Sequence, residues 1–219
     1  MAEAIRVLLA DDHRIVREGL KQVLADAPEI EVSAEATSGA EALAAVQARG
    51  GPPALQVVLL DIAMPDGDGL DVLQQLHKNW PQLPVLMLST YPERQYAVRC
   101  IKLGAAGYLN KGADPDDMIA AVRKVAGGGR YVTPATAEAL ASAVGGSSSR
   151  VGHEALSHRE YQVFRLLTTG HNVGEIGAHL QLAPNTVSTY RARILEKTGT
   201  KNDVELALYA ERHARAADL

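Results

Sequence analysis

Hydrophobic and polar positions alternate with two different periods along the first 130 residues. Short apolar runs predict buried strands, and Leu55 to Leu60 is of the kind that parallel sheets bury on both faces. Each run precedes a segment with apolar residues three or four positions apart, such as Arg14 to Asp26, which predicts an amphipathic helix. The expected strands are residues 5–10, 31–36, 55–60, 85–88 and 107–109. Five strand-and-helix units predict an α/β fold with a five-stranded, doubly wound parallel sheet.

The pattern changes after residue 130. Thr133-Pro134 predicts the start of one further helix, and the run of glycine and serine at residues 145–149 is a flexible linker by composition. Beyond it only helical periodicity remains, which predicts four short helices in an all-α module. We expect one domain at residues 1–130, a linker helix and flexible linker at 131–153, and a second domain at 154–219.

Two helix starts carry the pattern of a capping box, in which a serine and a glutamate three residues later exchange hydrogen bonds with the backbone. These pairs are Ser38 with Glu41 and Ser157 with Glu160. Asp114 followed by proline predicts another helix start.

Composition excludes several classes of protein. Hydrophobic residues make up 47% and charged residues 22% of the 219 residues, which is typical of globular proteins. Cys100 is the single cysteine, so an internal disulfide is excluded. No apolar run approaches the roughly 20 residues of a membrane helix, and acidic residues near the N-terminus argue against a secretory signal. We therefore expect a cytoplasmic protein that does not enter a membrane.

Chemistry-bearing side chains follow the expected strands at their carboxyl ends, where open parallel sheets bind ligands. They are Asp11, Asp12, Asp61, Ser89 and Lys111. Clustered carboxylates repel one another unless a hard cation joins them, and oxygen ligands suit Mg²⁺. A carboxylate could then attack a phosphoryl group that the hydroxyl and the ammonium hold. Alternatively, the aspartates merely cap the next helix and the lysine is a solvated charge, but both would have to hold at once.

The motifs LLADDHRIVREGL, VVLLDIAMPDGDGLDVL, LMLSTY and AAGYLNKG, in this order, make the chain resemble the receiver domain of two-component response regulators from residue 5 to about residue 127. That fold is flavodoxin-like. The resemblance implies that Asp61 is the phospho-acceptor. It implies that Asp12, Asp61 and the Ala63 carbonyl bind Mg²⁺ directly and that Asp11 helps through water. It also implies phosphoryl contacts from Ser89 and Lys111 and an aromatic switch, Tyr108.

The sequence departs from the family pattern at three positions. Gly112 follows Lys111, where receiver domains often carry a proline in a cis bond. Ala63 and Tyr91 stand two residues after Asp61 and Ser89, at positions that tune hydrolysis of the acyl phosphate in the family, and neither orients water strongly.

The net charge of −4 gives no ground for nucleic-acid binding, because it lies within the first 150 residues and the remainder is neutral. Locally, however, residues 184–201 hold four basic residues and one acidic residue, a net +3, in the second helix of a helix-turn-helix pattern. Small polar residues at the start of that helix suit approach to base edges. On spacing alone, a four-helix protein-interaction module with a basic face remains open.

The motifs LSHRE, EIGAHL and NTVSTYRARIL resemble the LuxR-type DNA-binding domain, and the whole chain resembles response regulators of the NarL/FixJ family. The resemblance implies that the helix from Pro184 enters the major groove of double-stranded DNA and that residues 203–209 lie in a dimer helix. By position, the residues facing bases would be Ser188, Thr189 and Ala192, and those nearer the DNA backbone Thr186, Tyr190, Arg191, Arg193 and Lys197. Val187, Glu160 and Ile176 are expected to be structural.

The leading hypothesis is a transcription factor rather than an enzyme: a histidine kinase or small phosphodonor phosphorylates Asp61, and the protein then forms a homodimer on DNA. A Mg²⁺-dependent phosphohydrolase is the second hypothesis, but Ala63 stands where haloacid-type phosphatases place a general acid. The third is a receiver that stays unphosphorylated and serves only for dimerisation.

Overall fold

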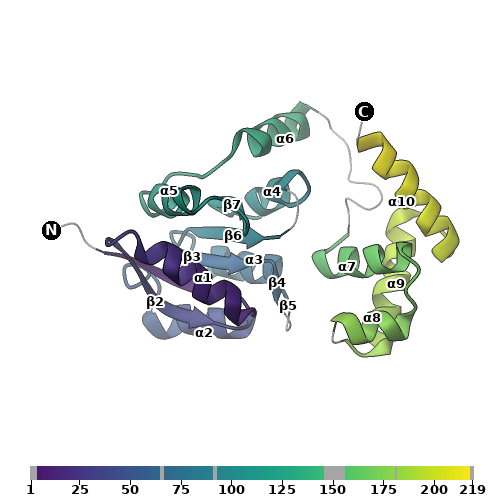
Figure 1. The fold of residues 1–219 in the computed structure, drawn as a ribbon, viewed down its shortest axis with the longest axis horizontal. Coiled ribbons are helices and arrows are strands. Elements are labelled where there is room, and N and C mark those ends of the chain that lie inside the picture. Colours follow the sequence, from purple (N-terminus) through teal and green to yellow (C-terminus); the bar gives the residue numbers. More distant parts are fainter. Residues whose placement is uncertain (1–3, 65–66, 91–92, 146–155, 181, 218–219) are drawn as a thin grey trace. The chain divides into compact units, whose positions relative to one another are not determined.

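Five strands form one parallel sheet in the order β2-β1-β3-β6-β7 (Figure 1). The strands are β1 (Ile5–Ala10), β2 (Ile30–Ala36), β3 (Val57–Asp61), β6 (Val85–Ser89) and β7 (Gly107–Asn110). This computed structural model describes residues 4–64, 67–90, 93–145, 156–180 and 182–217. The expected five-stranded parallel sheet is therefore confirmed.

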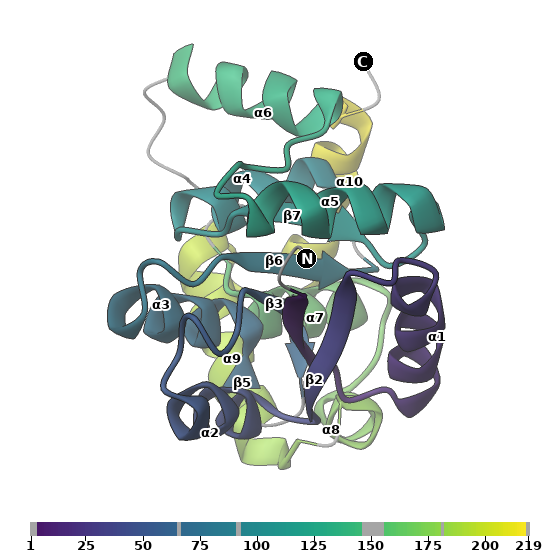
Figure 2. The same ribbon diagram turned by 90° about the vertical axis from the view of Figure 1, so that its left-hand side faces the viewer.

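Helices cover both faces of the sheet, as doubly wound folds require (Figure 2). On one face lie α1 (Arg14–Ala25) and α5 (Pro115–Ala126), and on the other lie α2 (Gly39–Arg49), α3 (Gly69–Asn79) and α4 (Glu93–Lys102). Strands β1, β3 and β6 present apolar side chains to both layers, and every residue of β3 is buried. The continuous apolar run at Leu55 to Leu60 has this physical origin.

A short hairpin after β3 was not expected from the sequence. It consists of β4 (Ala63–Met64) and β5 (Gly67–Asp68), which pair antiparallel. Strands of two residues are too short to give a periodic signal. The hairpin leads the chain from the end of β3 directly into α3.

One predicted capping box is present and the other is incomplete. Ser157 and Glu160 exchange both hydrogen bonds at the start of α7 (His158–Thr168). The Ser38 hydroxyl accepts the Glu41 N–H at 3.2 Å, but the Glu41 carboxylate accepts from Thr37 instead of from the Ser38 N–H. Thr37 offers that carboxylate oxygen both its N–H and its hydroxyl, at 2.7 and 2.8 Å, which explains the different partner.

The chain divides into two compact units, residues 1–147 and 148–219. Helix α6 (Pro134–Gly145) belongs to the first unit and packs against α4. Two hydroxyls at its start, Thr133 and the buried Thr136, donate to the Glu93 carboxylate in the first turn of α4. The start of α6 is therefore fixed to the start of α4.

The second unit contains α7, α8 (Val173–Leu180), α9 (Pro184–Thr198) and α10 (Asp203–Ala217). Its core is formed by Leu156, Val163, Phe164, Leu167, Ile176, Val187, Ile194 and Leu206. Position 177 within α8 requires a glycine, since a Cβ there would lie 2.7 Å from the Leu182 carbonyl oxygen in the turn that leads to α9. The four expected helices are confirmed, and so are the structural positions of Val187 and Ile176. No helix among the described residues is long and apolar enough to cross a membrane.

Candidate functional site

The parallel strands of the first unit bring five predicted side chains to one edge of the sheet. Asp11 follows β1, Asp61 ends β3, Ser89 ends β6 and Lys111 follows β7, while Asp12 comes next after Asp11. Since β1, β3, β6 and β7 are adjacent and parallel, their carboxyl ends meet at the same edge.

Lys111 joins two of the carboxylates. Its ammonium lies 2.6 Å from an Asp11 oxygen and 2.7 Å from an Asp61 oxygen. The side chains of both aspartates are buried, and that of Lys111 is 8% exposed. With Asp12 included, three carboxylates face one ammonium, which leaves two negative charges uncompensated when all are ionised.

Burial and this excess charge shift the pKa values at the site. Burial, opposed by Lys111, raises the pKa of Asp61 to about 6. Burial alone would lower the pKa of Lys111. The Asp61 and Asp11 carboxylates raise that pKa by more than burial lowers it, so the net shift is upward. Near neutral pH, the Asp61 carboxylate is consequently mostly ionised with a small protonated fraction, and Lys111 stays a cation.

The site fits a divalent cation. One oxygen each of Asp11, Asp12 and Asp61 is buried without a hydrogen bond of good geometry, although the Lys111 ammonium or the His13 ring lies nearby. Ligand atoms of these three aspartates and of His13 lie within 4.8 Å of one another. Buried carboxylates whose negative charge exceeds that of the nearby cations are costly, and a hard cation offsets that cost. The acidic pocket is therefore compatible with divalent metal binding.

Ser89 and Tyr108 connect the site to the sheet interior. Both are 1% exposed, and the Tyr108 hydroxyl is hydrogen-bonded to Ser89. Burial raises the pKa of Tyr108 above its usual range, so the phenol stays neutral. Tyr108 is a buried side chain here, in contact with the hydroxyl whose movement it is predicted to follow.

Ala63 and Gly112, two of the positions at which the sequence departs from the family pattern, make backbone hydrogen bonds near the site. The Ala63 N–H donates to the second Asp61 oxygen at 3.1 Å, and its carbonyl as a metal ligand stays a prediction. Lys111–Gly112 is trans, and the Gly112 N–H donates to the Asn110 side chain at 2.8 Å. Tyr91 lies outside the described residues.

In the second unit, α9 presents most of the predicted DNA-binding side chains on its surface. Thr186, Ser188, Thr189, Ala192 and Arg193 are exposed, and Tyr190 is half-buried. A shallow hollow on this surface is lined by Asn185, Thr186, Thr189, Tyr190 and Arg193. The arrangement leaves small polar groups and one arginine accessible to a ligand.

Two other side chains that are predicted to contact DNA, Arg191 and Lys197, are paired with acidic residues inside the second unit. Arg191 bonds Asp203 at the start of α10, with 2.7 Å between Nε and Oδ1. Lys197 bonds the buried Glu160 carboxylate at 2.6 Å. Burial raises the pKa of Glu160, but hydrogen bonds from Lys197 and Ser157 lower it more, so the carboxylate is ionised and paired.

Family comparisons agree with both geometries. The model of the response regulator receiver domain matches residues 7–123, and that of the bacterial regulatory proteins of the luxR family matches residues 154–210. The chain belongs to the NarL/FixJ family of response regulators. It is a DNA-binding response regulator of a two-component system, and members of this family are transcriptional regulators rather than enzymes.

Individual relatives cover nearly the whole response regulator. The transcriptional regulatory protein UhpA of Escherichia coli is 44% identical over 203 residues, which are 93% of this chain and 96% of UhpA. The response regulator GacA of Pseudomonas protegens is 40% identical over 95% of this chain and 96% of its own length. RcsB of Salmonella enterica, solved bound to the promoter rprA with phosphomimetic BeF₃⁻, has a TM-score of 0.59 at 25% identity, covering 94% of this chain and 98% of that chain.

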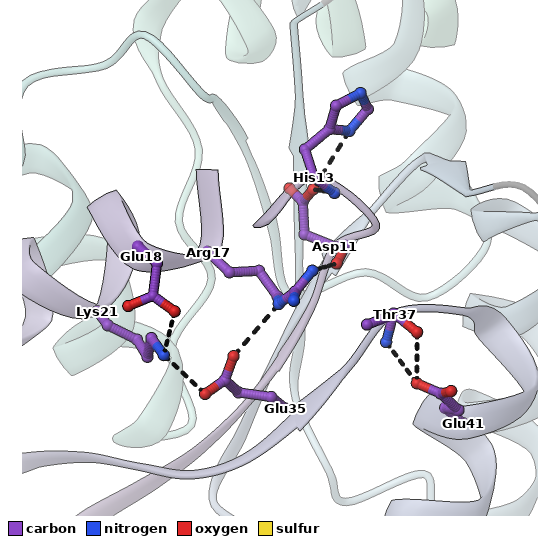
Figure 3. A network of polar contacts seen from close by, with 8 residues as sticks. All are labelled: Asp11, His13, Arg17, Glu18, Lys21, Glu35, Thr37 and Glu41. Carbon is purple, nitrogen blue, oxygen red and sulfur yellow. Dashed lines mark hydrogen bonds and ion pairs between the residues drawn. The ribbon is translucent and has the colours of Figure 1, made fainter. Parts of the chain in front are cut away.

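Several residues that support the response regulator's acidic pocket were missed by sequence reasoning. Arg17 in α1 donates to the Asp11 carbonyl oxygen at 2.7 Å and bonds Glu35 of β2, which also pairs with Lys21 (Figure 3). This network fixes the backbone where β1 ends. The spacing of Arg17 from the aspartates, one helical turn into α1, was the available signal.

Gly69, at the start of α3, lies directly behind the expected phospho-acceptor. A Cβ at this position would approach the Asp61 carbonyl oxygen to 2.3 Å and Ile62 Cα to 2.8 Å. The close approach of two backbone segments therefore requires glycine there. It follows from the β4–β5 hairpin, which the sequence pattern did not reveal.

Proposed function

We propose that this response regulator accepts a phosphoryl group on Asp61 from a partner histidine kinase or a small phosphodonor. The observation that supports this is the meeting of three carboxylates with the Lys111 ammonium at one sheet edge. We further propose that Mg²⁺ occupies the acidic pocket, held by Asp11, Asp12, Asp61 and the Ala63 carbonyl.

The chemistry is a transfer between two nucleophiles. Because the pKa of Asp61 is about 6, its carboxylate is mostly anionic at neutral pH and can attack phosphorus directly. A new bond forms between the Asp61 oxygen and phosphorus, while the bond from phosphorus to the donor's nitrogen or oxygen breaks and its electron pair leaves with the donor. Bound Mg²⁺ would supply the positive charge that lets anionic carboxylates and phosphoryl oxygens approach one another.

Lys111 and Ser89 are proposed to hold the transferred group. The ammonium contacts Asp61 before transfer, so it lies within reach of phosphoryl oxygens placed on that carboxylate. Ser89 is the last residue of the adjacent strand β6, and its hydroxyl can donate to a second phosphoryl oxygen. Tyr108, now bonded to Ser89, would follow this movement as the aromatic switch.

Phosphorylation is proposed to produce a homodimer that binds double-stranded DNA. Helix α10 exposes Val204 and Leu208 by 72% and 52%, and their spacing of four residues places them on one helical face. Such an apolar pair suits contact with the same helix of a second copy. Two α9 helices would then meet DNA sites about one helical turn apart. We also propose a cytoplasmic location, because the family that matches residues 154–210 is one of bacterial regulatory proteins, and bacterial DNA lies in the cytoplasm.

Intact-mass spectrometry with acetyl phosphate tests the acceptor. We expect wild-type protein to gain one phosphoryl group with MgCl₂ and none in excess EDTA, and the adduct to be removed by hydroxylamine, which cleaves acyl phosphates. Asp61→Asn should gain none, whereas Glu31→Gln, a change at an exposed carboxylate on β2, should behave as wild type. Equal incorporation in Asp61→Asn would refute the assignment.

Light scattering tests the dimer. Phosphorylated wild-type protein should double in mass, and the Leu208→Glu variant should stay monomeric while still taking up phosphate. A phosphorylated protein that remains monomeric at every concentration and still binds paired DNA sites would contradict the proposal.

A further inference from the structure

The basic side chains of α9 differ in whether a nearby acidic side chain neutralises their charge. Arg191 is paired with Asp203 and Lys197 with Glu160, so each cation has an anion within 2.7 Å. Arg193 is exposed, and the structure gives it no ion-pair partner among the described residues. A phosphate approaching Arg191 or Lys197 meets a neutral pair, whereas one approaching Arg193 meets a full positive charge.

Arg193 also occupies a different part of the helix surface from Arg191. Asn185, Thr189 and Arg193 are spaced by four residues, which aligns them along one face of α9. All three line the hollow on this helix. Arg191 instead lies toward α10, where Asp203 holds its guanidinium.

The hydrogen bond of the Thr189 hydroxyl determines which groups this face offers to a ligand. It donates to the Asn185 carbonyl oxygen at 3.0 Å, within the same helix. The donor is thereby used internally, which leaves the methyl group and an acceptor lone pair for a ligand. A face that offers a methyl group beside an unpaired guanidinium suits base edges in the major groove better than phosphates alone.

We infer that Arg193 reads a guanine in the major groove, and that Arg191 does not contact DNA but positions α10 against α9. The two parallel donors of a guanidinium match the O6 and N7 acceptors of guanine. The Arg191–Asp203 pair joins the recognition helix to the helix that carries Val204 and Leu208. This inference rests on the proposed use of α9 as the recognition helix, and it revises the expectation that all three basic residues meet the DNA backbone.

Selection of binding sites from randomised duplexes, with phosphorylated full-length protein, tests the base reader. Wild type should select a guanine at one position of each half-site. Arg193→Lys keeps the charge but replaces the rigid planar fork of donors by a compact ammonium, so it should weaken that preference by about 5- to 150-fold while keeping the salt dependence of binding. Arg193→Ala should lose the preference and lower the slope of the salt dependence by about one, and Arg191→Gln should keep both the preference and the slope.

The positioning role of Arg191 has its own readout. Arg191→Asp and Asp203→Arg should each lower the thermal stability of the second unit and weaken binding to all duplexes equally. The double variant restores the pair with its charges exchanged and should recover both properties.

The failures of this inference and of the proposed function are distinguishable. Wild-type protein that selects no duplex refutes DNA reading by α9 altogether. Wild type that selects a site, with Arg193→Lys keeping its guanine preference or Arg191→Gln changing the preferred sequence, overturns only the roles given to the two arginines.

Discussion

Replacing Asp61 by asparagine should stabilise the metal-free receiver unit at neutral pH. Asp61 is 1% exposed, and its pKa is raised from 3.8 to about 6 even with Lys111 at 2.7 Å. A shift of one pKa unit corresponds to about 1.4 kcal/mol, so ionised Asp61 costs the folded unit up to about 3 kcal/mol. Asparagine has the same shape without the charge, and Lys111 retains its ion pair with Asp11. We expect a gain of about 1–3 kcal/mol.

The difference in stability between Asp61→Asn and wild type should depend on pH. Between about pH 4 and pH 6 the folded state binds more protons at Asp61 than the unfolded state does, so wild-type stability falls as pH rises through that window. Asp61→Asn lacks this loss. The difference between the two proteins should therefore be small at pH 4 and reach its full value by pH 7. Saturating MgCl₂ should narrow it, since the cation compensates the wild-type carboxylate and the variant lacks a ligand.

Urea unfolding followed by tryptophan fluorescence measures this effect in the full-length protein. Trp80 is the single tryptophan and lies in the first unit, so its emission reports on that unit. Glu31→Gln removes an exposed carboxylate from β2 and should leave the free energy of unfolding unchanged. Equal or lower stability of Asp61→Asn at pH 7 in EDTA would refute the reasoning, because it would mean that the buried charge is not costly.

Three further substitutions test the supporting contacts. Gly69→Ala forces a Cβ against the Asp61 carbonyl oxygen, so it should destabilise the first unit by about 1–3 kcal/mol in the same fluorescence assay; unchanged unfolding would contradict the close approach. Glu160→Gln removes the negative charge that Lys197 pairs with and should cost about 1.5–3 kcal/mol, seen as faster amide exchange in α7 and α9; exchange as slow as in wild type would contradict this. Glu93→Gln weakens the hydrogen bond to Thr136 by about 1 kcal/mol and should speed exchange at the start of α6; exchange as slow as in wild type would argue against that contact.

The parallel sheet was predictable because burial on both faces makes each strand a continuous apolar run. The run at residues 5–10 coincides with β1. The run at residues 55–60 is offset from β3, because Leu55 is buried before the strand begins and Asp61 pairs with Leu88 inside it. A charged residue within the ladder cannot be recognised from hydrophobicity. The β4–β5 hairpin was missed for a different reason, its length.

The meeting of the aspartates with Lys111 could be expected from topology, because strand order alone brings their ends together. The partners of the α9 cations could not. Helical spacing places Arg191 and Lys197 on the helix, but their acidic partners lie 12 and 37 residues away on other helices. Glu160 was identified as structural from the resemblance, yet nothing in the sequence linked it to Lys197. Tertiary ion pairs of this kind need the packing of α7, α9 and α10.

The segment from β6 to α4 joins the two halves of the receiver's chemistry. Ser89 ends β6 at the proposed phosphoryl site and is bonded to Tyr108, while Glu93, four residues later, holds the hydroxyls at the start of α6. Helix α6 is the last described element before the second unit. The chain from Ser89 to Glu93 thus carries both a residue of the proposed phosphoryl site and the carboxylate that holds the start of α6.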